Sequence, residues 1–212
     1  MDINHFKHLP IMGILRGITE EMVEPIVETA QSAGLETLEI TMDTPRAANL
    51  IKRMIRAAQG RMTIGAGTVL TMDDLHSALD AGATFIVLPT IVDEVVAYCS
   101  QNRIPVFPGA LTPNEVHRAW ASGAYMVKVF PANLFGPEYF KEIKGPFRKI
   151  ELLACGGVTA ENIQSFFSCG ASGASFGGSI FKPEWLKNRQ YPLIGESLKT
   201  LLNRFLGWRN QA

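Results

Sequence analysis

The sequence predicts an α/β fold, a single (β/α)8 barrel of the TIM-barrel class that spans residues 1–212 as one domain. Short apolar runs alternate with amphipathic segments along the whole chain, and this alternation is typical of parallel strands joined by helices. Eight strand–helix pairs fit within the 212 residues, which is the size of a compact barrel. No linker or shift in composition divides the sequence.

The expected strands are apolar runs rich in β-branched residues, which favour extended structure. Their ranges are 11–16, 37–41, 63–68, 85–88, 106–108, 126–130, 151–154 and 174–176. The amphipathic segments between and after them predict helices near 19–33, 45–58, 72–81, 92–101, 113–121, 137–143, 160–168 and 193–207.

Threonines and prolines mark the starts of several helices. Thr19, Thr71 and Thr159 each precede acidic residues, a combination that caps a helix N-terminus and suits its dipole. Pro45 and Pro113 each follow a threonine, as expected of a proline at the first helical position.

Glycines mark helix ends. Gly34, Gly82, Gly123 and Gly170 each follow a small residue and lead into an expected strand. Their recurrence indicates a repeated βα unit. An open doubly-wound sheet is the alternative, but the turn after the first strand, residues 16–19, lacks the glycine-rich fingerprint of a dinucleotide-binding fold.

Charge and composition argue against several classes of partner. Twenty basic and twenty acidic residues cancel, so neither nucleic acid nor a membrane surface is an expected partner. No apolar run approaches the roughly 20 residues that span a bilayer, and residues 1–7 lack the pattern of a signal peptide. Three scattered cysteines, Cys99, Cys155 and Cys169, indicate reduced thiols in a cytoplasmic protein.

One lysine lies inside an apolar strand. The segment 125–131 is apolar and β-branched on both sides of Lys128 and ends at a proline. Lysine is rarely buried without a partner, and burial lowers its pKa, which supplies a neutral amine that can form a Schiff base with a carbonyl. The alternative is a structural lysine whose ammonium group reaches solvent or a carboxylate.

Strand parity predicts that three charged side chains share the barrel mouth, the carboxyl-terminal end of the strands where barrel enzymes place their chemistry. Side chains alternate between the two faces of a strand. If the aliphatic residues face the helices, then Arg16, Glu39 and Lys128 all point inward. Buried charges are costly unless they are paired or used, so this convergence favours a catalytic site over a structural cluster of ion pairs.

Each polar residue at the mouth has an expected role and a structural alternative. Lys128 is the expected nucleophile, and Glu39 is either a proton shuttle or a static counter-ion. Arg16 offers a fork for a carboxylate or phosphate, or else pairs with Glu39 or Asp43. Thr68 either donates its hydroxyl to the same carboxylate or forms a local cap.

Two glycine pairs follow the last two strands, in Gly156-Gly157-Val158-Thr159 and Gly177-Gly178-Ser179-Ile180. Many barrels bind phosphate at this place through backbone N–H groups and a helix N-terminus. We therefore expect a phosphate site there, and tight βα turns are the alternative.

No metal or cofactor is expected. The four histidines, His5, His8, His76 and His117, lie at the N-terminus or on expected helices and not at strand ends. Cys155 lies near the site without a partner histidine, so we interpret it as a small apolar filler.

Along nearly its whole length the chain resembles the class I aldolases that act on 2-keto-3-deoxy-6-phosphogluconate and 4-hydroxy-2-oxoglutarate. The matching motifs follow one another in order over one barrel. They are Leu38-Glu39-Ile40-Thr41, Gly65-Ala66-Gly67-Thr68-Val69-Leu70, Pro108-Gly109, Lys128-Val129-Phe130-Pro131-Ala132, Gly156-Gly157-Val158 and Gly178-Ser179.

The resemblance implies roles for individual residues. Lys128 would be the Schiff-base lysine, Glu39 the proton shuttle and Thr68 a contact of the pyruvate carboxylate. The resemblance also implies a homotrimer without a metal. It implies phosphate contacts at Gly157, Gly178 and Ser179, and the glycine pair adds Gly156 to the expected phosphate site. Further residues expected in the pocket are Pro89, Phe130 and Cys155.

Two positions depart from the phosphogluconate-specific members of the family. Those members carry an arginine where this chain has Asp43, and a threonine where Cys155 stands. This chain instead has Arg16 after its first strand and Phe135-Gly136-Pro137 after its sixth, which resemble the 2-keto-3-deoxy-6-phosphogalactonate branch. Arg16 is therefore expected to take over carboxylate binding.

The expected function is reversible cleavage of a 2-keto-3-deoxy-6-phospho sugar acid, of the gluconate or galactonate type, to pyruvate and glyceraldehyde 3-phosphate. One alternative is an aldolase for an unphosphorylated 4-hydroxy-2-oxo acid. A non-catalytic phosphosugar-binding barrel is another, and a metal-dependent phosphosugar epimerase would need strand-end ligands that the sequence does not offer.

Overall fold

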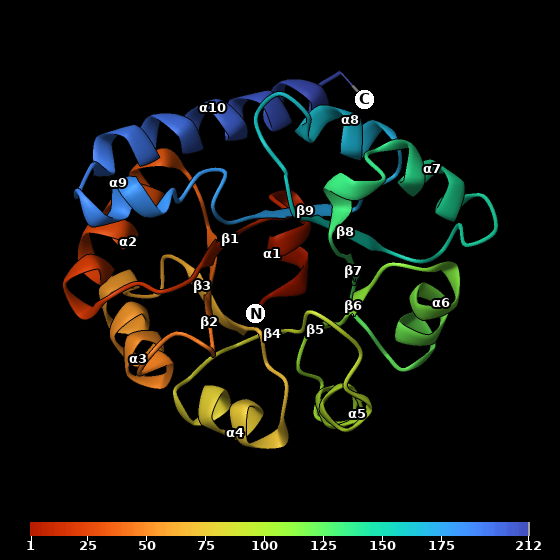
Figure 1. The fold of residues 1–212 in the computed structure, drawn as a ribbon, viewed down its shortest axis with the longest axis horizontal. Helices are drawn as coiled ribbons and strands as arrows, with labels where there is room; N and C mark the ends of the chain where they lie inside the picture. The colour runs from red at the N-terminus through yellow and green to blue at the C-terminus, as the bar shows by residue number, and fades with distance from the viewer. Residues whose placement is uncertain (212) are drawn as a thin grey trace.

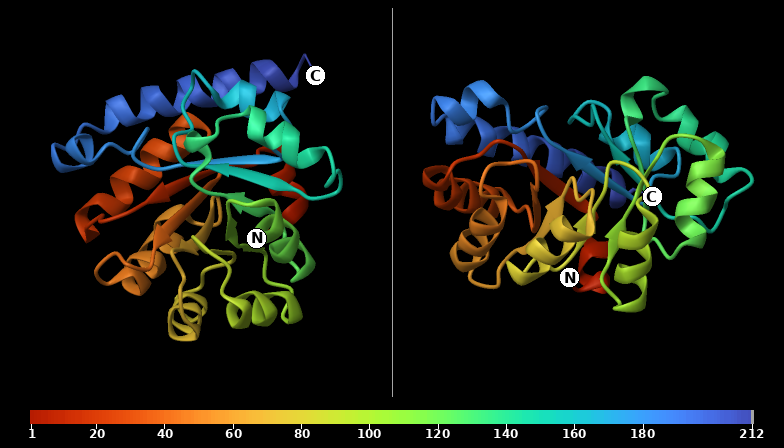
Figure 2. Two further views of the ribbon diagram at one scale, coloured as in Figure 1. Left: turned by 45° about the vertical axis from the view of Figure 1, so that its right-hand side comes forward. Right: turned by 60° about the horizontal axis from the view of Figure 1, so that its bottom comes forward.

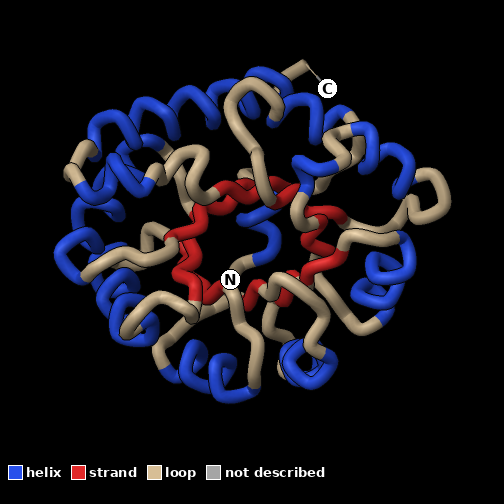
Figure 3. The backbone as a smooth tube through the Cα atoms, viewed as in Figure 1, coloured by secondary structure: helices blue, strands red, loops and turns tan. Residues whose placement is uncertain are grey.

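A ring of parallel strands lies inside a ring of helices (Figure 1; Figure 3). The structure is a computed structural model that describes residues 1–211. Its single sheet has the order β5-β4-β3-β2-β1-β9-β8-β7-β6, and the paired neighbours are parallel. The strands are β1 Ile11–Leu15, β2 Thr37–Thr41, β3 Thr63–Gly67, β4 Ile86–Val87, β5 Val106–Phe107, β6 Gly109–Ala110, β7 Val127–Val129, β8 Leu152–Cys155 and β9 Gly173–Phe176.

The sheet closes on itself through an interrupted strand. β5 and β6 are two halves of one barrel strand, separated by Pro108, which has no N–H to donate. β5 pairs with β4, β6 pairs with β7, and the Pro108 carbonyl accepts a hydrogen bond from the Lys128 N–H at 2.9 Å. The nine short strands therefore make eight barrel strands, and the predicted (β/α)8 fold is confirmed.

Helices cover the outside of the barrel, and the long last helix packs across two earlier ones, α2 and α8 (Figure 2). All eight expected strands and all eight expected helices are present, but the sequence reasoning missed α1, α9 and the short helix η2. The helices are α1 Ile3–His8, η1 Glu20–Met22, α2 Val23–Ala33, α3 Ala47–Ala58, α4 Met72–Asp80, α5 Asp93–Gln101, α6 Pro113–Ala121, η2 Ala132–Leu134, α7 Glu138–Lys144, α8 Ile163–Ser168, α9 Pro183–Lys187 and α10 Tyr191–Arg209. No helix within residues 1–211 has the length and apolar character needed to cross a membrane.

The predicted helix starts are partly right. Thr71 caps α4 in a capping box, and Pro113 occupies the first turn of α6 behind a second capping box. Thr19 makes no side-chain cap hydrogen bond. The prediction for Pro45 is wrong, because α3 begins two residues later behind Arg46, which has a left-handed backbone with φ of 63°. At the helix ends, the four predicted glycines all have a positive φ, as a left-handed stop requires.

Two separate apolar cores lie on the two sides of the sheet. The larger one lies between strands and helices and includes Leu38, Ile40, Val127 and Val129. The smaller one fills the amino-terminal end of the barrel, and α1, which lies across that end of the ring (Figure 3), contributes the fully buried ring of Phe6 to it. The other members of this inner core are Met12, Phe85, Val87, Phe107, Met126 and Leu153. The inner core leaves the carboxyl-terminal half of the barrel to the polar side chains.

Candidate active site

Lys128 lies in the middle of the barrel, directly above the inner core. It belongs to the inward face of β7, pairs in register with Gly109 and Leu153, and is only 6% exposed. Its Nζ lies 5.1 Å from the centre of the Phe130 ring, which is 39% exposed and marks the open end of the strand. Among residues 1–211 no carboxylate lies within 4.0 Å of this ammonium group as an ion pair. The amine is thus buried and reachable from the mouth.

Glu39 is the second inward charge, on β2, and it is 1% exposed. Burial raises its pKa to about 7, although the charges of Lys128 and Arg16 act in the opposite direction. Its Oε2 atom has no hydrogen-bond partner in the described part of the chain. The carboxyl has room because position 67 is glycine, where a Cβ would overlap the Glu39 carboxylate. A carboxyl with a pKa near neutrality can both accept and donate a proton.

Cys155 on β8 and Ser175 on β9 line the barrel interior next to the strand that carries Lys128. They are partners in the register of β8 and β9, both are buried, and burial raises the pKa of the Cys155 thiol while Lys128 and Ser175 lower it. Cys155 therefore fits its predicted part as a small buried neighbour of Lys128. Ser175 was missed by the sequence reasoning, although its position between Ala174 and Phe176 already assigned it to the inward face.

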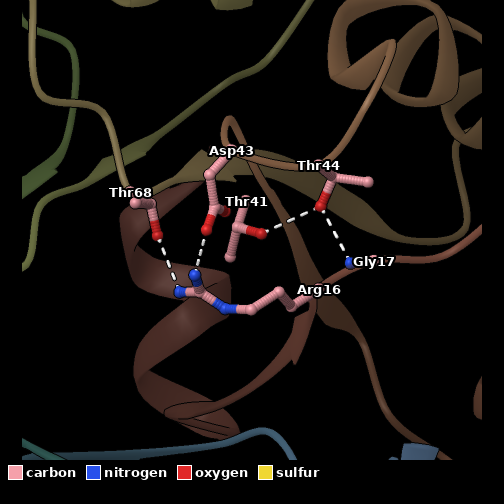
Figure 4. A network of polar contacts seen from close by, with 6 residues as sticks. All are labelled: Arg16, Gly17, Thr41, Asp43, Thr44 and Thr68. Atoms are coloured by element: carbon pink, nitrogen blue, oxygen red, sulfur yellow. Dashed lines mark hydrogen bonds and ion pairs between the residues drawn. The ribbon is translucent and has the colours of Figure 1, made fainter.

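Arg16 and Thr68 meet at the mouth, as Figure 4 shows. The Arg16 Nη2 donates to Thr68 Oγ1 at 3.1 Å, and Nη1 forms an ion pair with Asp43. Of the two structural partners that the sequence offered for Arg16, the structure has Asp43 and not Glu39. Thr68 has a φ of 53°, a strained backbone for a β-branched residue, and such strain is common at functional sites.

The two glycine loops lie side by side. The Ser179 hydroxyl donates to the Val158 carbonyl at 2.7 Å, which ties the loop after β9 to the loop after β8. Gly156 and Gly157 both have a positive φ, which glycine alone adopts without strain. A Cβ on Gly178 would meet no atom within 4 Å, so the space beside it is open. The helix expected from residue 160 begins only at Ile163, so the loop after β8 is longer than the sequence predicted.

Pro89 also reaches the site, through its backbone. A Cβ on Gly109 would overlap the Pro89 carbonyl, so glycine at position 109 lets the loop after β4 approach the strand beside Lys128. Within residues 1–211 no cluster of three or more His, Cys, Asp or Glu side chains is placed to hold a metal ion.

The model of the aldolase family described as KDPG and KHG aldolase matches residues 3–196. The chain belongs to the KDPG and KHG aldolase family.

Individual relatives agree with this assignment. A 2-dehydro-3-deoxy-6-phosphogalactonate aldolase of Escherichia coli is 34% identical to this aldolase over 175 residues, which are 82% of this chain and 85% of that protein. A solved structure described as native KDPGal superposes with a TM-score of 0.89 at 29% identity, covering 95% of this chain and 97% of that one.

The structure of a third relative contains a covalent intermediate with pyruvate. The KDPG aldolase of Legionella pneumophila, solved with pyruvate captured as a covalent carbinolamine intermediate, superposes with a TM-score of 0.83 at 27% identity and covers 91% of this chain and 93% of that one. The family match confirms the prediction of an aldehyde-lyase, and the carbinolamine of that relative agrees with the predicted Schiff-base chemistry.

Proposed function

We propose that this aldolase reversibly cleaves a 2-keto-3-deoxy-6-phospho sugar acid to pyruvate and glyceraldehyde 3-phosphate, with Lys128 and Glu39 as its catalytic residues. The observation that carries the proposal is the placement of these two side chains. Both are buried on inward faces of the barrel, and Glu39 has a pKa of about 7. A buried amine and a carboxyl that titrates near neutrality are the two groups that imine-based cleavage requires.

The reaction follows from these two groups. The Lys128 amine adds to the C2 ketone, and the resulting carbinolamine takes up a proton and loses water to give a protonated imine. Glu39, directly or through water, removes the proton of the C4 hydroxyl. The C3–C4 bond then breaks, its electron pair moves toward the imine nitrogen, and glyceraldehyde 3-phosphate leaves. Glu39 returns its proton to C3 of the resulting enamine, and addition of water to the protonated imine releases pyruvate, one proton and the free Lys128 amine.

The two ends of the substrate would be held by different groups. Arg16 and Thr68, which already contact each other, are proposed to bind the carboxylate. The backbone N–H groups of Gly156, Gly157, Gly178 and Ser179 are proposed to bind the phosphate, because the Ser179 hydroxyl already donates to the Val158 carbonyl. Pro89, Phe130 and Cys155 would shape the pocket between the two ends.

The configuration of the sugar acid is the finer question. The 34% identical relative is named for phosphogalactonate, and we favour the galactonate type. The family description also includes KHG aldolases, so an unphosphorylated 4-hydroxy-2-oxo acid is the second candidate. Comparison of kcat/KM for the two phosphorylated sugar acids and for 4-hydroxy-2-oxoglutarate decides among them.

Borohydride reduction in the presence of pyruvate tests the catalytic lysine directly. Peptide mass spectrometry is expected to find a reduced pyruvyl adduct on the peptide that contains Lys128, and Lys128→Ala should lose both adduct and cleavage. Lys52→Ala is the matched control, because Lys52 is an exposed lysine on helix α3, outside the proposed site. Pyruvate that binds without any adduct on Lys128 would contradict the imine mechanism.

The oligomeric state, the cellular location and the extent of the domain are three further proposals. We propose a homotrimer, which light scattering of the purified protein tests by mass. All three cysteines are unpaired, as is typical of reducing compartments, and we propose a cytoplasmic location. Residues 1–212 are proposed to form one domain, which a single cooperative unfolding transition would support.

A further inference from the structure

Arg16 is a long, flexible side chain held in one place by two partners. It follows the last residue of β1, and its guanidinium is 59% exposed at the mouth. One terminal nitrogen forms an ion pair with Asp43 and the other donates to Thr68 Oγ1 at 3.1 Å (Figure 4). A planar group fixed at both terminal nitrogens has a defined orientation, which an exposed arginine otherwise lacks.

The backbone next to Arg16 is fixed as well. The N–H of Gly17 donates to Thr44 Oγ1 at 3.0 Å, and that oxygen lies 3.0 Å from Thr41 Oγ1 (Figure 4). Thr41 and Thr44 are both buried. The turn after β2 therefore holds the chain after β1 twice, through Thr44 on the backbone and through Asp43 on the guanidinium.

Asp43 takes only part of what the guanidinium offers. It meets Arg16 through one oxygen and one nitrogen, whereas a guanidinium has five N–H donors. The remaining donors stay available to a ligand. An ion pair this exposed contributes little to stability, so its effect on the orientation of Arg16 matters more than its contribution to folding.

We propose that Asp43 is a positioning residue for substrate binding: it holds the Arg16 guanidinium so that the free N–H donors face the substrate carboxylate. This inference rests on the proposed function, in which Arg16 binds that carboxylate. Orientation set in advance lowers the entropy cost of binding, so loss of Asp43 weakens binding of the carboxylate end. The phosphate end and the imine chemistry at Lys128 are left as they are.

The test measures the pyruvate concentration that gives half-maximal borohydride trapping on Lys128. Asp43→Ala is expected to raise it about 5–10-fold, and Arg16→Ala about as much or more. Asp43→Asn keeps an oxygen acceptor for the guanidinium and is expected to stay within about twofold of the wild type. Trapping of acetone, which has no carboxylate, should be the same in all variants, a readout that a general structural defect would not leave unchanged.

A double variant and a matched control complete the design. Asp43→Ala should have no further effect in an Arg16→Ala background, because it acts through Arg16. Asp93→Ala is the control, since Asp93 forms a similarly exposed ion pair with Arg118 in the helical ring, and it should leave trapping unchanged.

The failures are distinguishable. No adduct in the wild type would refute the imine function, and an Arg16→Ala protein with unchanged trapping would refute carboxylate binding by Arg16. An effect of Arg16→Ala without one of Asp43→Ala would overturn the positioning role alone. Tighter pyruvate binding in Asp43→Ala would also overturn it, by making Asp43 a competitor of the substrate, and additive effects in the double variant would show that Asp43 does not act through Arg16.

Discussion

The carboxylate of Glu39 occupies the space where a side chain at position 67 would lie. The two residues belong to adjacent strands, β2 and β3, and a Cβ built on Gly67 overlaps the Glu39 carboxylate. The Glu39 carboxyl lies inside the barrel and has no ion-pair partner among the described residues. Its position depends on the glycine at position 67, and its pKa of about 7 results from its burial.

Gly67→Ala should therefore act as an indirect Glu39 variant. The added methyl group forces the carboxyl to rotate away from the mouth, and we expect kcat to fall by about 100-fold or more, within the usual range for losing general acid–base catalysis. Steady-state kinetics of cleavage measures this loss. Gly207→Ala is the control, because a Cβ there meets no atom within 4 Å in α10, and it should be neutral or slightly stabilising. Full activity in Gly67→Ala would show that Glu39 is not needed in its observed position.

Glu39→Gln should raise stability at alkaline pH while abolishing cleavage. The folded pKa of Glu39 is about 7, above its ordinary value of 4.5. The folded state therefore holds this proton to higher pH than the unfolded state does. Stability from this group is full below pH 4.5 and falls as the pH rises toward 7, by about 3 kcal/mol in total. Gln is neutral at every pH and avoids that cost.

Thermal unfolding at two pH values checks the sign. At pH 8 the Tm of Glu39→Gln should exceed that of the wild type by roughly 5–10 °C, and at pH 4.5 the two should nearly coincide. Glu115 is the matched control with the opposite sign, because backbone hydrogen bonds from Leu111 and Thr112 lower its pKa. Glu115→Gln should thus lower the Tm at pH 8. A Tm gain in Glu39→Gln that is equal at both pH values would argue against a raised pKa.

Arg16→Ala and Ser179→Ala should affect opposite ends of the substrate. In the condensation direction we expect Arg16→Ala to raise the KM for pyruvate about 10-fold, because it removes a contact to a charged group. We expect Ser179→Ala to raise the KM for glyceraldehyde 3-phosphate about 5-fold, because it releases the loop after β9 from the Val158 carbonyl. Each variant should leave the other KM within about twofold. Initial rates with one substrate varied at a time give both values, and a reversed pattern would exchange the two assignments.

Phe6→Ala should weaken the fold without altering the chemistry. The Phe6 ring is fully buried in the inner core and meets Phe107 edge to face at a centroid distance of 5.9 Å. Its truncation should cost about 3–5 kcal/mol of unfolding free energy, measured by urea denaturation, with kcat unchanged at low temperature. Phe135→Ala, at a ring that is 57% exposed, should cost less than about 1 kcal/mol.

The alternation of side chains along the strands was the sequence feature that predicted the site. Leu38 and Ile40 lie in the larger core between strands and helices, and Glu39 lies on the other face of β2. Val127 and Val129 lie in the same core, and Lys128 lies on the other face of β7. The alternation is dictated by strand geometry and needs no knowledge of partners. It therefore placed the two buried charges correctly, and the family motifs placed the strands in order.

Partners across the barrel could not be predicted in the same way. Parity assigns a face, but the choice of Asp43 over Glu39 as the partner of Arg16 depends on how the turns after β1 and β2 meet in space. The helix α1 was missed because Phe6 is its one buried residue, so its six residues show no helical periodicity. The break at Pro108 was not predicted. A proline in a strand usually indicates an edge strand, and because a closed barrel has no edge strand, the proline was expected to end the strand and not to interrupt it.

The position of α1 determines from which end of the barrel substrates and products can reach or leave the site. Because α1 and the inner core fill the amino-terminal end of the barrel, ligands reach Lys128 from the end that Phe130 borders. In the proposed mechanism, pyruvate stays covalently attached to Lys128 while the phosphorylated aldehyde leaves through the open end. Water for the hydrolysis must enter by the same route. Because pyruvate stays attached until this water hydrolyses the imine, the aldehyde is the first product to leave and pyruvate the second.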